Sequence, residues 1–485
     1  MLFPPQKDLS KYYVKVGRFD SYEKEVSKQN GANILPVSCT VYTVEDSMDS
    51  ICASWTFLAQ AVKGGAGVAI DMSNIRPKGI IGRGGMVSKG VCNWLNIYSE
   101  IVIRVAQGRG GEKKGAGVVF LEASHKDLEE FLSLPMAAIP GLSRGVYIQP
   151  SDLNIPGVVE SILTALSKGK VFLAKYCYNQ RGERLYTNLC TEVLIKSQMT
   201  CILGQINLGL VTDFRLLLDI YVYAYQQLRD GRQSALDGIK ESGHYLDPDD
   251  DKQIGLGVFG LANMLAHFNV KYSEFVDALD YVLDGGRLTY LFDTLAYRIA
   301  YSFMIAYEEV SRLAEQDGFD RVFAIAPTAS VSYRNKDADG YTCTPEISPP
   351  VCHSETKIAR RTTSEGFTTA QYPPNVEVAD VNVSWQVYDR LVGAWQKMQN
   401  VESLGHSVSH NWWMSKPFTK ENLEEFLASN RLTSYYTYPV VVDYADKRDV
   451  NDADLSSEDV NSFWGGDDGD ENYDPMSNYC ESCGN

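Results

Sequence analysis

The chain has 485 residues, enough for a large core and for two or three domains or one big barrel. Its 44% hydrophobic and 22% charged residues are ordinary for a soluble globular protein. The formal net charge of −17 argues against bulk attraction to nucleic acid, so local groups would have to hold any bound nucleotide. Residues 1–17 show no apolar signal core and no stretch reaches transmembrane length, which predicts a cytoplasmic protein without a membrane segment.

The first predicted elements alternate between strand and helix. A short buried strand over residues 34–42 is followed by a helix over 46–63, whose apolar face carries Met48, Ile51, Trp55, Leu58 and Val62. Glycines at 64–67 end that helix, and a strand resumes at 68–70. This alternation predicts an α/β protein.

The later elements continue the same pattern. They are glycine loops at 82–85 and 108–111, strands at 118–121 and 145–148, helical stretches at 214–242 and 260–316, a strand at 322–325 leading into a loop over 326–332, a helix at 383–399 and a β-rich run at 435–442.

Three familiar motifs lack the context that their usual function requires. Residues 255–260 fit G-x-G-x-x-G but follow a polar loop, so we interpret them as helix-packing glycines. Residues 141–145 fit the esterase elbow, yet a strand pattern follows where a helix is needed. His406 and His410 have the spacing of helical metal ligands but no third ligand, which favours a core or solvated pair and predicts no metal site.

The C-terminal segment, residues 446–485, holds twelve acidic residues against Lys447 and Arg448 and ends with Cys480 and Cys483 in a Cys-x-x-Cys pair. A segment so acidic and poor in apolar residues is typical of an extended tail. The pair could be half of a zinc site, but zinc needs four ligands and no second pair lies nearby. We interpret it as a mobile dithiol that reduces a disulfide elsewhere, with Cys39, Cys190 and Cys201 as candidates.

Three reactive side chains alternate in the segment 187–193. In an extended loop, Asn188, Cys190 and Glu192 would project to one side and converge. An amide, a thiol and a carboxylate together offer orientation, radical or nucleophilic chemistry and general base action. The spacing alone is equally typical of a half-buried strand edge.

The sequence Asn188-Leu189-Cys190-Thr191-Glu192, with Ser38-Cys39 far upstream and Cys201 downstream, resembles the large, catalytic subunit of ribonucleotide reductase. Further similar segments are 36–39, 45–51, 65–68, 75–76 with 83–85, 254–262, 326–332 and 435–436. Their number, order and spacing make the resemblance specific. The short span before Cys39 is similar to a minimal class I-like form of the kind carried by phages, which would act in the host cytoplasm.

The resemblance implies a ten-stranded α/β barrel made of two antiparallel five-stranded halves, with a central finger loop carrying Cys190. It implies three regions: a short N-terminal segment over 1–38, the barrel over 39–445 and a redox tail over 446–485.

It also implies a reaction in which ribonucleotides, as di- or triphosphates, are reduced to deoxyribonucleotides. Cys190 would form a thiyl radical, Glu192 would accept the 3′-OH proton and Asn188 would orient the ribose. Cys39 and Cys201, which in isolation are more often inert buried thiols, would supply two electrons by forming a disulfide. Cys480 and Cys483 would reduce that disulfide and be reset by a thioredoxin or glutaredoxin.

For the substrate, the resemblance implies contacts at Ser38, at the backbone of Ala66 and Gly67, and at a phosphate segment. The phosphate contacts are Thr328, Ala329, Ser330 and Ser332. Taken without the resemblance, Thr328 to Ser332 would be a plain loop and helix cap.

The radical source distinguishes the classes of the family. Tyr435 and Tyr436 resemble the tyrosine pair that relays an electron from a metal-containing, ferritin-like partner subunit in class I enzymes. The alternative interpretation of these two residues is aromatic packing in the core of a β-strand. An adenosylcobalamin-dependent class II enzyme is the alternative mechanism, and a non-radical thiol–disulfide oxidoreductase is the alternative activity. Asp46 and Arg76 resemble residues that bind a nucleotide effector.

Overall fold

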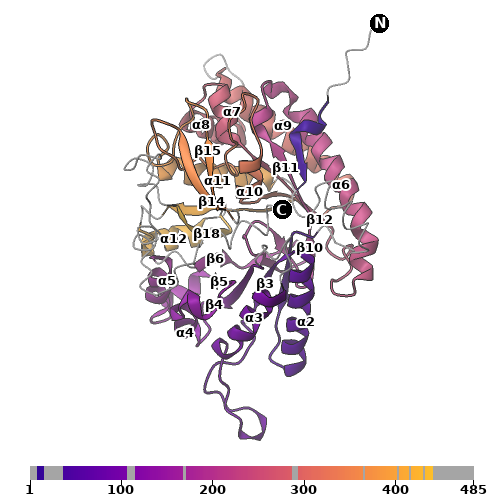
Figure 1. Ribbon diagram of the computed structural model, residues 1–485, viewed down its shortest axis with the longest axis vertical. Coiled ribbons are helices and arrows are strands. Elements are labelled where there is room, and N and C mark those ends of the chain that lie inside the picture. Colours follow the sequence, from indigo (N-terminus) through magenta and orange to yellow (C-terminus); the bar gives the residue numbers. More distant parts are fainter. Residues whose placement is uncertain are drawn as a thin grey trace.

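The computed structural model describes residues 8–15, 37–105, 115–167, 171–286, 293–363, 366–400, 404–413, 417–429 and 432–440. Within these ranges strands and helices alternate along most of the chain, which confirms the predicted α/β class. Figure 1 shows the labelled strands near the centre, with helices α2 to α5 toward one end of the molecule and α7 to α9 toward the other.

The first half consists of five parallel strands in the order β2-β3-β4-β5-β6. Parallel neighbours need a crossover connection, and a helix lies between each consecutive pair. The elements are β2 (Cys39–Thr43), α2 (Met48–Gly64), β3 (Gly67–Asp71), η2 (Arg83–Gly85), α3 (Cys92–Val105), β4 (Gly117–Glu122), α4 (Leu128–Ser133), η4 (Met136–Ala138), β5 (Leu142–Ile148), η5 (Pro150–Asn154), α5 (Val158–Ser167) and β6 (Val171–Lys175).

The second half is a sheet in the order β1-β11-β12-β13-β16, in which only the edge strand β1 is antiparallel to its neighbour. Its strands are β1 (Tyr13–Lys15), β11 (Leu203–Asn207), β12 (Gln253–Phe259), β13 (Arg321–Ile325) and β16 (Gly405–Val408). Its helices are η1 (Ser10–Tyr12), η6 (Leu208–Leu210), η7 (Phe214–Leu216), α6 (Leu217–Glu241), α7 (Leu261–His267), α8 (Tyr272–Leu283), α9 (Leu295–Gln316), α10 (Ala329–Arg334) and α11 (Trp385–Gln399).

Antiparallel contacts join the two halves at both edges. On one side β10 (Thr200–Cys201), separated from β11 by Ile202 alone, pairs with β2. On the other side β18 (Ser434–Val440) pairs antiparallel with β6 and parallel with β17 (Asn411–Trp413), which follows β16 after two residues. The outer elements α12 (Lys420–Ala428), β14 (Ile358–Thr363) and β15 (Gly366–Gln371) complete the described fold.

Between the halves lies a hairpin built from β7 (Cys177–Tyr178), β8 (Arg184–Thr187) and β9 (Leu194–Ile195), with β8 antiparallel to both neighbours. It follows β6 directly, and its tip, residues 188–193, is buried.

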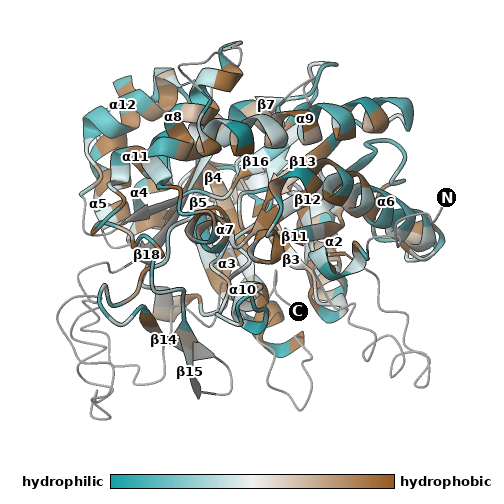
Figure 2. Ribbon diagram, turned by 90° about the horizontal axis from the view of Figure 1, so that it is seen from above, coloured by the Kyte–Doolittle hydropathy of each residue, from teal (hydrophilic) through white to brown (hydrophobic). Residues whose placement is uncertain are grey.

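The buried side chains of the strands form two apolar clusters. The larger one, called the outer cluster, lies between the sheets and their helices and contains Ile70, Val119 and Val258. The smaller one, called the inner cluster, contains Val41 and Phe120 from the first half together with Leu203 and Ala324 from the second. Because neighbouring strand residues point to opposite faces, each buried strand contributes to both. Figure 2 shows the resulting apolar colouring along the central strands.

Local sequence explains the boundaries of α2. Ser47 accepts a hydrogen bond from the Ser50 backbone N–H at its start, and Gly65 ends it in the left-handed conformation at φ 89°. Ile51, Leu58 and Val62 are buried as predicted, whereas Met48 is 55% exposed and does not belong to the buried face. Met48 is the first residue of the helix.

Two further sequence interpretations are wrong. Gly255 and Gly257 lie inside strand β12, between β11 and β13, rather than at a helix contact. Residues 329–332, predicted as loop, form the start of the short helix α10.

Candidate active site

The hairpin tip carries Asn188, Cys190 and Glu192, all fully buried. It is a turn rather than the extended loop expected from alternation: the Thr191 N–H donates to the Asn188 carbonyl at 3.3 Å, and Thr191 has φ 63°. The Asn188 side chain closes the turn, since its Oδ1 accepts from the Val193 N–H at 3.0 Å. The three residues therefore share the buried tip through turn geometry.

Buried groups from β13, β16 and β18 hold the backbone of this tip and of the adjoining residue Leu194. The Ser407 N–H donates to the Glu192 carbonyl at 2.9 Å, and the Ser434 hydroxyl donates to the Thr191 carbonyl at 3.3 Å. Arg321 donates from Nε to the Leu194 carbonyl at 2.8 Å while pairing with Asp251, and both charged side chains are at most 4% exposed. The tip is thus fixed from several strands at once.

His406 is a further buried contact of the residues beside the tip. Its Nε2 lies 3.0 Å from the Ile254 carbonyl, and its Nδ1 lies 3.1 Å from both the N–H and the carbonyl of Leu194. Burial, and next the positive charge of Arg321, lower the His406 pKa well below its ordinary value. The imidazole is therefore neutral. His406 and His410 are both buried, as a core pair would be.

Cys39 and Cys201 face each other across the two halves. They are direct partners in the antiparallel β2–β10 ladder, and the Ser38 N–H donates to the Cys201 carbonyl at 3.0 Å. Opposed residues in such a ladder have Cα atoms about 4.5–5.5 Å apart, within the range of about 4.4–6.8 Å that a disulfide requires. Both thiols belong to the inner cluster together with Cys190.

Burial shifts the pKa values of the reactive groups. It raises the pKa of Glu192 from 4.5 to about 7, opposed by the tip backbone and by Asn188. Burial raises the pKa of Cys201 well above its usual 9.0, and the nearby Cys39 and Glu192 raise it further. The site therefore holds a carboxyl that titrates near neutral pH beside a protonated thiol, a combination suited to proton transfer.

Several polar atoms around the tip have no hydrogen-bond partner among the described residues. They are the Ser38 hydroxyl, Nδ2 of Asn188 and both carboxyl oxygens of Glu192. Unsatisfied buried polar atoms are costly, at about 1–3 kcal/mol each, and call for water or a polar ligand.

The predicted phosphate segment is only partly available. Thr328 is buried with φ 46°, and its hydroxyl already accepts from the Glu346 N–H at 2.9 Å. Ser332 is buried and its N–H donates to the Thr328 carbonyl at 2.8 Å. Ala329 and Ser330 start helix α10, and their side chains lie outside the described part.

The backbone amides of Ala66 and Gly67 are engaged within the protein. Ala66 N–H donates to the Ala61 carbonyl at 3.0 Å, and Gly67 N–H to the Ser38 carbonyl at 2.9 Å. Hydrogen bonds to a nucleotide at these positions would therefore come from Ser38, whose hydroxyl lacks a described partner.

Tyr435 lies in strand β18 next to Ser434, but its ring packs in the outer cluster. It contacts His410, Phe426 and Phe418 at ring centroid distances of 4.6, 4.8 and 5.5 Å. Its hydroxyl donates to Asp389 at 3.3 Å, and burial raises the Asp389 pKa to about 6. The backbone of Tyr436 pairs with Asn411, and its side chain lies outside the described part.

The two residues predicted to bind an effector contact each other. Asp46 and Arg76 form an ion pair at 2.6 Å and are both partly exposed, at 34% and 41%. The glycine loop 108–111 and the dithiol Cys480 and Cys483 lie outside the described residues.

Sequence reasoning missed Arg321, Asp251 and His406, which hold the tip. Arg321 opens a buried strand, and a charged residue there is the one local signal of a special role. His406 was predicted to be a core or solvated residue, without a contact to the tip. Within the described ranges, no group of three His, Cys, Asp or Glu side chains is placed to hold a metal ion, and no helix is long and apolar enough to cross a membrane.

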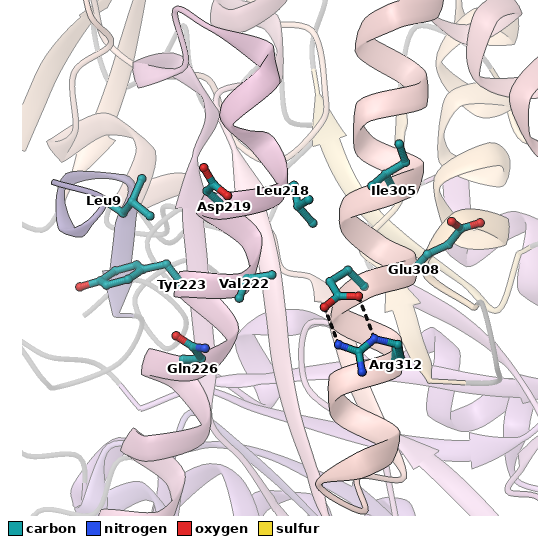
Figure 3. A pocket seen from close by; sticks show the side chains of 10 residues that line it. Leu9, Leu218, Asp219, Val222, Tyr223, Gln226, Ile305, Glu308 and Arg312 are labelled. Atoms are coloured by element: carbon teal, nitrogen blue, oxygen red, sulfur yellow. Dashed lines mark hydrogen bonds and ion pairs between the residues drawn. The ribbon is translucent and has the colours of Figure 1, made fainter. Parts of the chain in front are cut away.

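Figure 3 shows a cavity of about 700 Å³ away from this chemistry. It lies on the outer side of α6 and α9, where Val222 and Ile305 contribute apolar surface and Glu309 pairs with Arg312 at 2.6 Å. None of the predicted site residues lines it.

The fold and site together define an α/β protein with a buried thiol hairpin beside an opposed pair of cysteines. The family model described as "Ribonucleotide reductase, barrel domain" matches residues 37–139 and 174–280. Over these residues the chain is similar to the barrel domain of ribonucleotide reductase, which confirms the resemblance seen in the motifs.

Curated relatives match over part of their length. A vitamin B12-dependent ribonucleoside-diphosphate reductase of Mycobacterium tuberculosis is 27% identical over 283 residues, half of this chain and 40% of that protein. The ribonucleoside-diphosphate reductase subunit alpha of Synechocystis is 35% identical over 99 residues, 20% of this chain and 12% of that protein. The chain thus covers less than half of the length of these relatives.

Among solved structures, the class Id ribonucleotide reductase alpha subunit of Actinobacillus ureae superposes with a TM-score of 0.57 at 15% identity. The match covers 90% of this chain and 89% of that one. At this identity the similarity shows the fold alone.

Proposed function

We propose that this chain is the catalytic subunit of a ribonucleotide reductase. The observation that carries the proposal is the register of Cys39 opposite Cys201, beside a buried tip with Cys190, Glu192 and Asn188. A non-radical thiol–disulfide oxidoreductase would need the cysteine pair but not Asn188 and Glu192 beside Cys190 at one buried tip. The named relatives act on ribonucleoside diphosphates, which favours diphosphate substrates.

In the proposed reaction, Cys190 loses a hydrogen atom to the radical source and its thiyl radical removes the ribose 3′ hydrogen. Glu192 accepts the 3′-OH proton, Asn188 orients the ribose, and the 2′-OH leaves as water. Cys39 and Cys201 give up two electrons and two protons and form one disulfide. The sum converts a ribonucleotide and two thiols into a deoxyribonucleotide, a disulfide and water.

The barrel itself is part of the proposal. Counting β10 with β11 and β16 with β17 as single bent strands, the pairings run through ten strands and return to β2. We propose that residues 39–445 form this ten-stranded barrel, with 188–193 as its finger tip. Residues 1–38 would be a short leading segment and 446–485 a redox tail.

For the radical source we propose a ferritin-like, metal-containing partner subunit. The hydrogen bond from Tyr435 to Asp389 supports this, because a tyrosine that loses an electron also needs an acceptor for its proton. The fold neighbour from a class I enzyme is consistent with it. The B12-dependent relatives favour the second candidate, an adenosylcobalamin-dependent reductase, in which Tyr435 serves packing alone.

The remaining assignments follow from the same proposal. Cys480 and Cys483 would carry electrons from a thioredoxin or glutaredoxin to the buried pair, in the cytoplasm of the cell or of a phage host. Ser38 and the segment Thr328–Ser332 would hold the nucleotide, and the Asp46–Arg76 pair would open to bind an effector.

The test is formation of deoxycytidine diphosphate from cytidine diphosphate by the purified chain with dithiothreitol. Activity on adding adenosylcobalamin alone identifies the second candidate, whereas activity only on adding a ferritin-like subunit supports the first. Cys190→Ser should abolish product in either case, while Cys52→Ser, which changes an exposed thiol, should not. Product formation by the Cys190→Ser chain would overturn the radical mechanism.

A further inference from the structure

Gln205 is a buried amide that the proposed reaction does not use. It lies in β11, is fully buried, and neither its Oε1 nor its Nε2 has a hydrogen-bond partner among the described residues. Leu203 belongs to the inner cluster and Ile206 to the outer one, so strand alternation places Gln205 on the inner face, on the same side as Leu203.

On this face the Gln205 amide lies against Gly257 of β12, and neither Gly257 nor the nearby Gly255 has a side chain. A Cβ built at Gly257 would lie 2.5 Å from Oε1 of Gln205, and one at Gly255 would lie 3.4 Å from Sγ of Cys201. These two glycines are two residues apart on one face of the strand, which corresponds to about 7 Å. The Gln205 amide and the Cys201 thiol thus lie over neighbouring glycines on one face of β12.

The place of Gln205 in the sheet also relates it to the predicted phosphate segment, Thr328 to Ser332. Gln205 is paired with Gly257, and Gly257 contacts Ala324 of β13, four residues before Thr328. The amide therefore lies between the cysteine pair and the chain segment that leads to Thr328. A ligand that spanned from one to the other along this face would lie near the amide.

We propose that the Gln205 side chain hydrogen-bonds the ribonucleotide substrate in the part between its reacting ribose carbons and its phosphates. The carboxamide offers one acceptor for a ribose hydroxyl and two donors for ribose or phosphate oxygens. This inference rests on the proposed function and adds a substrate contact to it. An unpaired buried amide is otherwise costly, so leucine would be expected here if the position served packing alone.

The test uses Gln205→Leu and, as a second variant that keeps the side-chain length, Gln205→Met. Cytidine diphosphate binding to the full reduced chain is measured by calorimetry without any radical source, so no turnover is needed. The Kd should rise about tenfold, the effect of losing one or two hydrogen bonds, while the thermal midpoint stays equal or rises. A structural amide would show the reverse: a lower midpoint and unchanged binding.

Gln399 provides a matched control. It is also fully buried with both amide atoms unpartnered among the described residues, but it ends α11 on the outer side. Gln399→Leu should keep the Kd of the wild type. Unchanged binding in both Gln205 variants would overturn the inference while the proposed function stands; a wild-type chain that binds no cytidine diphosphate would overturn the proposed function itself.

Discussion

At the scale of single residues, burial sets the chemistry of the site. Glu192 is surrounded by protein, has no described partner for either carboxyl oxygen, and has its pKa raised to about 7. Cys201 stays protonated because burial disfavours its thiolate. The same carboxyl in solvent would be ionised throughout the neutral range and could not exchange a proton there.

The Glu192 pKa predicts opposite pH dependences for activity and stability. Because the folded chain binds this proton more tightly than the unfolded chain, stability falls as the pH rises from about 4.5 to 7. The rate that depends on Glu192 as a base rises with pH, with an apparent pKa near 7. Glu192→Gln should abolish most activity and, at pH 8, stabilise the chain by up to about 3 kcal/mol.

Urea unfolding and rate measurements from pH 5 to 8 check this. Glu315→Gln, a change at an exposed position, should leave both profiles unchanged. A Glu192→Gln chain that is less stable than wild type at pH 8 would contradict the burial argument.

The register of Cys39 and Cys201 predicts a disulfide on mild oxidation. Their positions in the ladder satisfy the Cα separation that the bond needs, so it should form without unfolding. Peptide mapping under non-reducing conditions should find a Cys39–Cys201 linkage. Cys39→Ser removes it and Cys52→Ser keeps it; a linkage of Cys201 to Cys190 instead would contradict the assignment.

At the scale of elements, the hairpin tip depends on strands that are distant in sequence. Hydrogen bonds within its six residues close the turn, while β16 and β18 hold the Glu192 and Thr191 carbonyls and β13 holds the adjoining Leu194 carbonyl. A buried ion pair such as Arg321–Asp251 is not in itself a strong stabiliser, because desolvation offsets its attraction. Its evident effect here is to place Arg321 against the Leu194 carbonyl.

This arrangement predicts that substitutions at Arg321 and Asp251 change the stability of the chain and its activity independently. Arg321→Met leaves Asp251 buried without its partner and should cost about 3–5 kcal/mol. Adding Asp251→Leu should restore most of that stability but not the donor to Leu194, so activity stays low. Denaturant unfolding and product formation check the pair, with the exposed Arg298→Met as control, expected within about 1 kcal/mol. Full activity in the double variant would show that the hydrogen bond from Arg321 to the Leu194 carbonyl is dispensable.

At the scale of the whole molecule, the buried cysteine pair must communicate with an external reductant. Both thiols are fully buried, so a large reductase cannot reach them directly. The proposed carrier is the dithiol of the acidic tail, whose two cysteines lie at the end of the chain.

Replacing both Cys480 and Cys483 with serine should therefore stop turnover after about one product per chain when thioredoxin is the reductant. Dithiothreitol, which is small, should sustain turnover in the same variant. Product counting per chain distinguishes the two conditions, and Cys52→Ser serves as the control. Unimpaired turnover with thioredoxin would remove the tail from the mechanism.

Much of this protein could be predicted from the sequence. Periodicity located α2, α6, α9 and α11, and apolar runs located β3, β4, β5 and β13, because these patterns are local. Alternate spacing grouped Asn188, Cys190 and Glu192, and the family resemblance added Cys39 and Cys201 to this set. The same local reasoning misplaced Gly255 and Gly257, since a glycine in a strand and a glycine at a helix contact share one signature.

The tertiary structure determined which other residues these side chains contact. Cys39 is opposite Cys201 because β10 pairs with β2 across the junction of the two halves. Thr191 adopts a positive φ because distant strands hold the tip, and the Glu192 pKa depends on everything packed around it. Sequence determines residue types and local periods. Long-range pairing and desolvation exist only once the whole chain has buried its apolar surface, and here they decide the chemistry of the site.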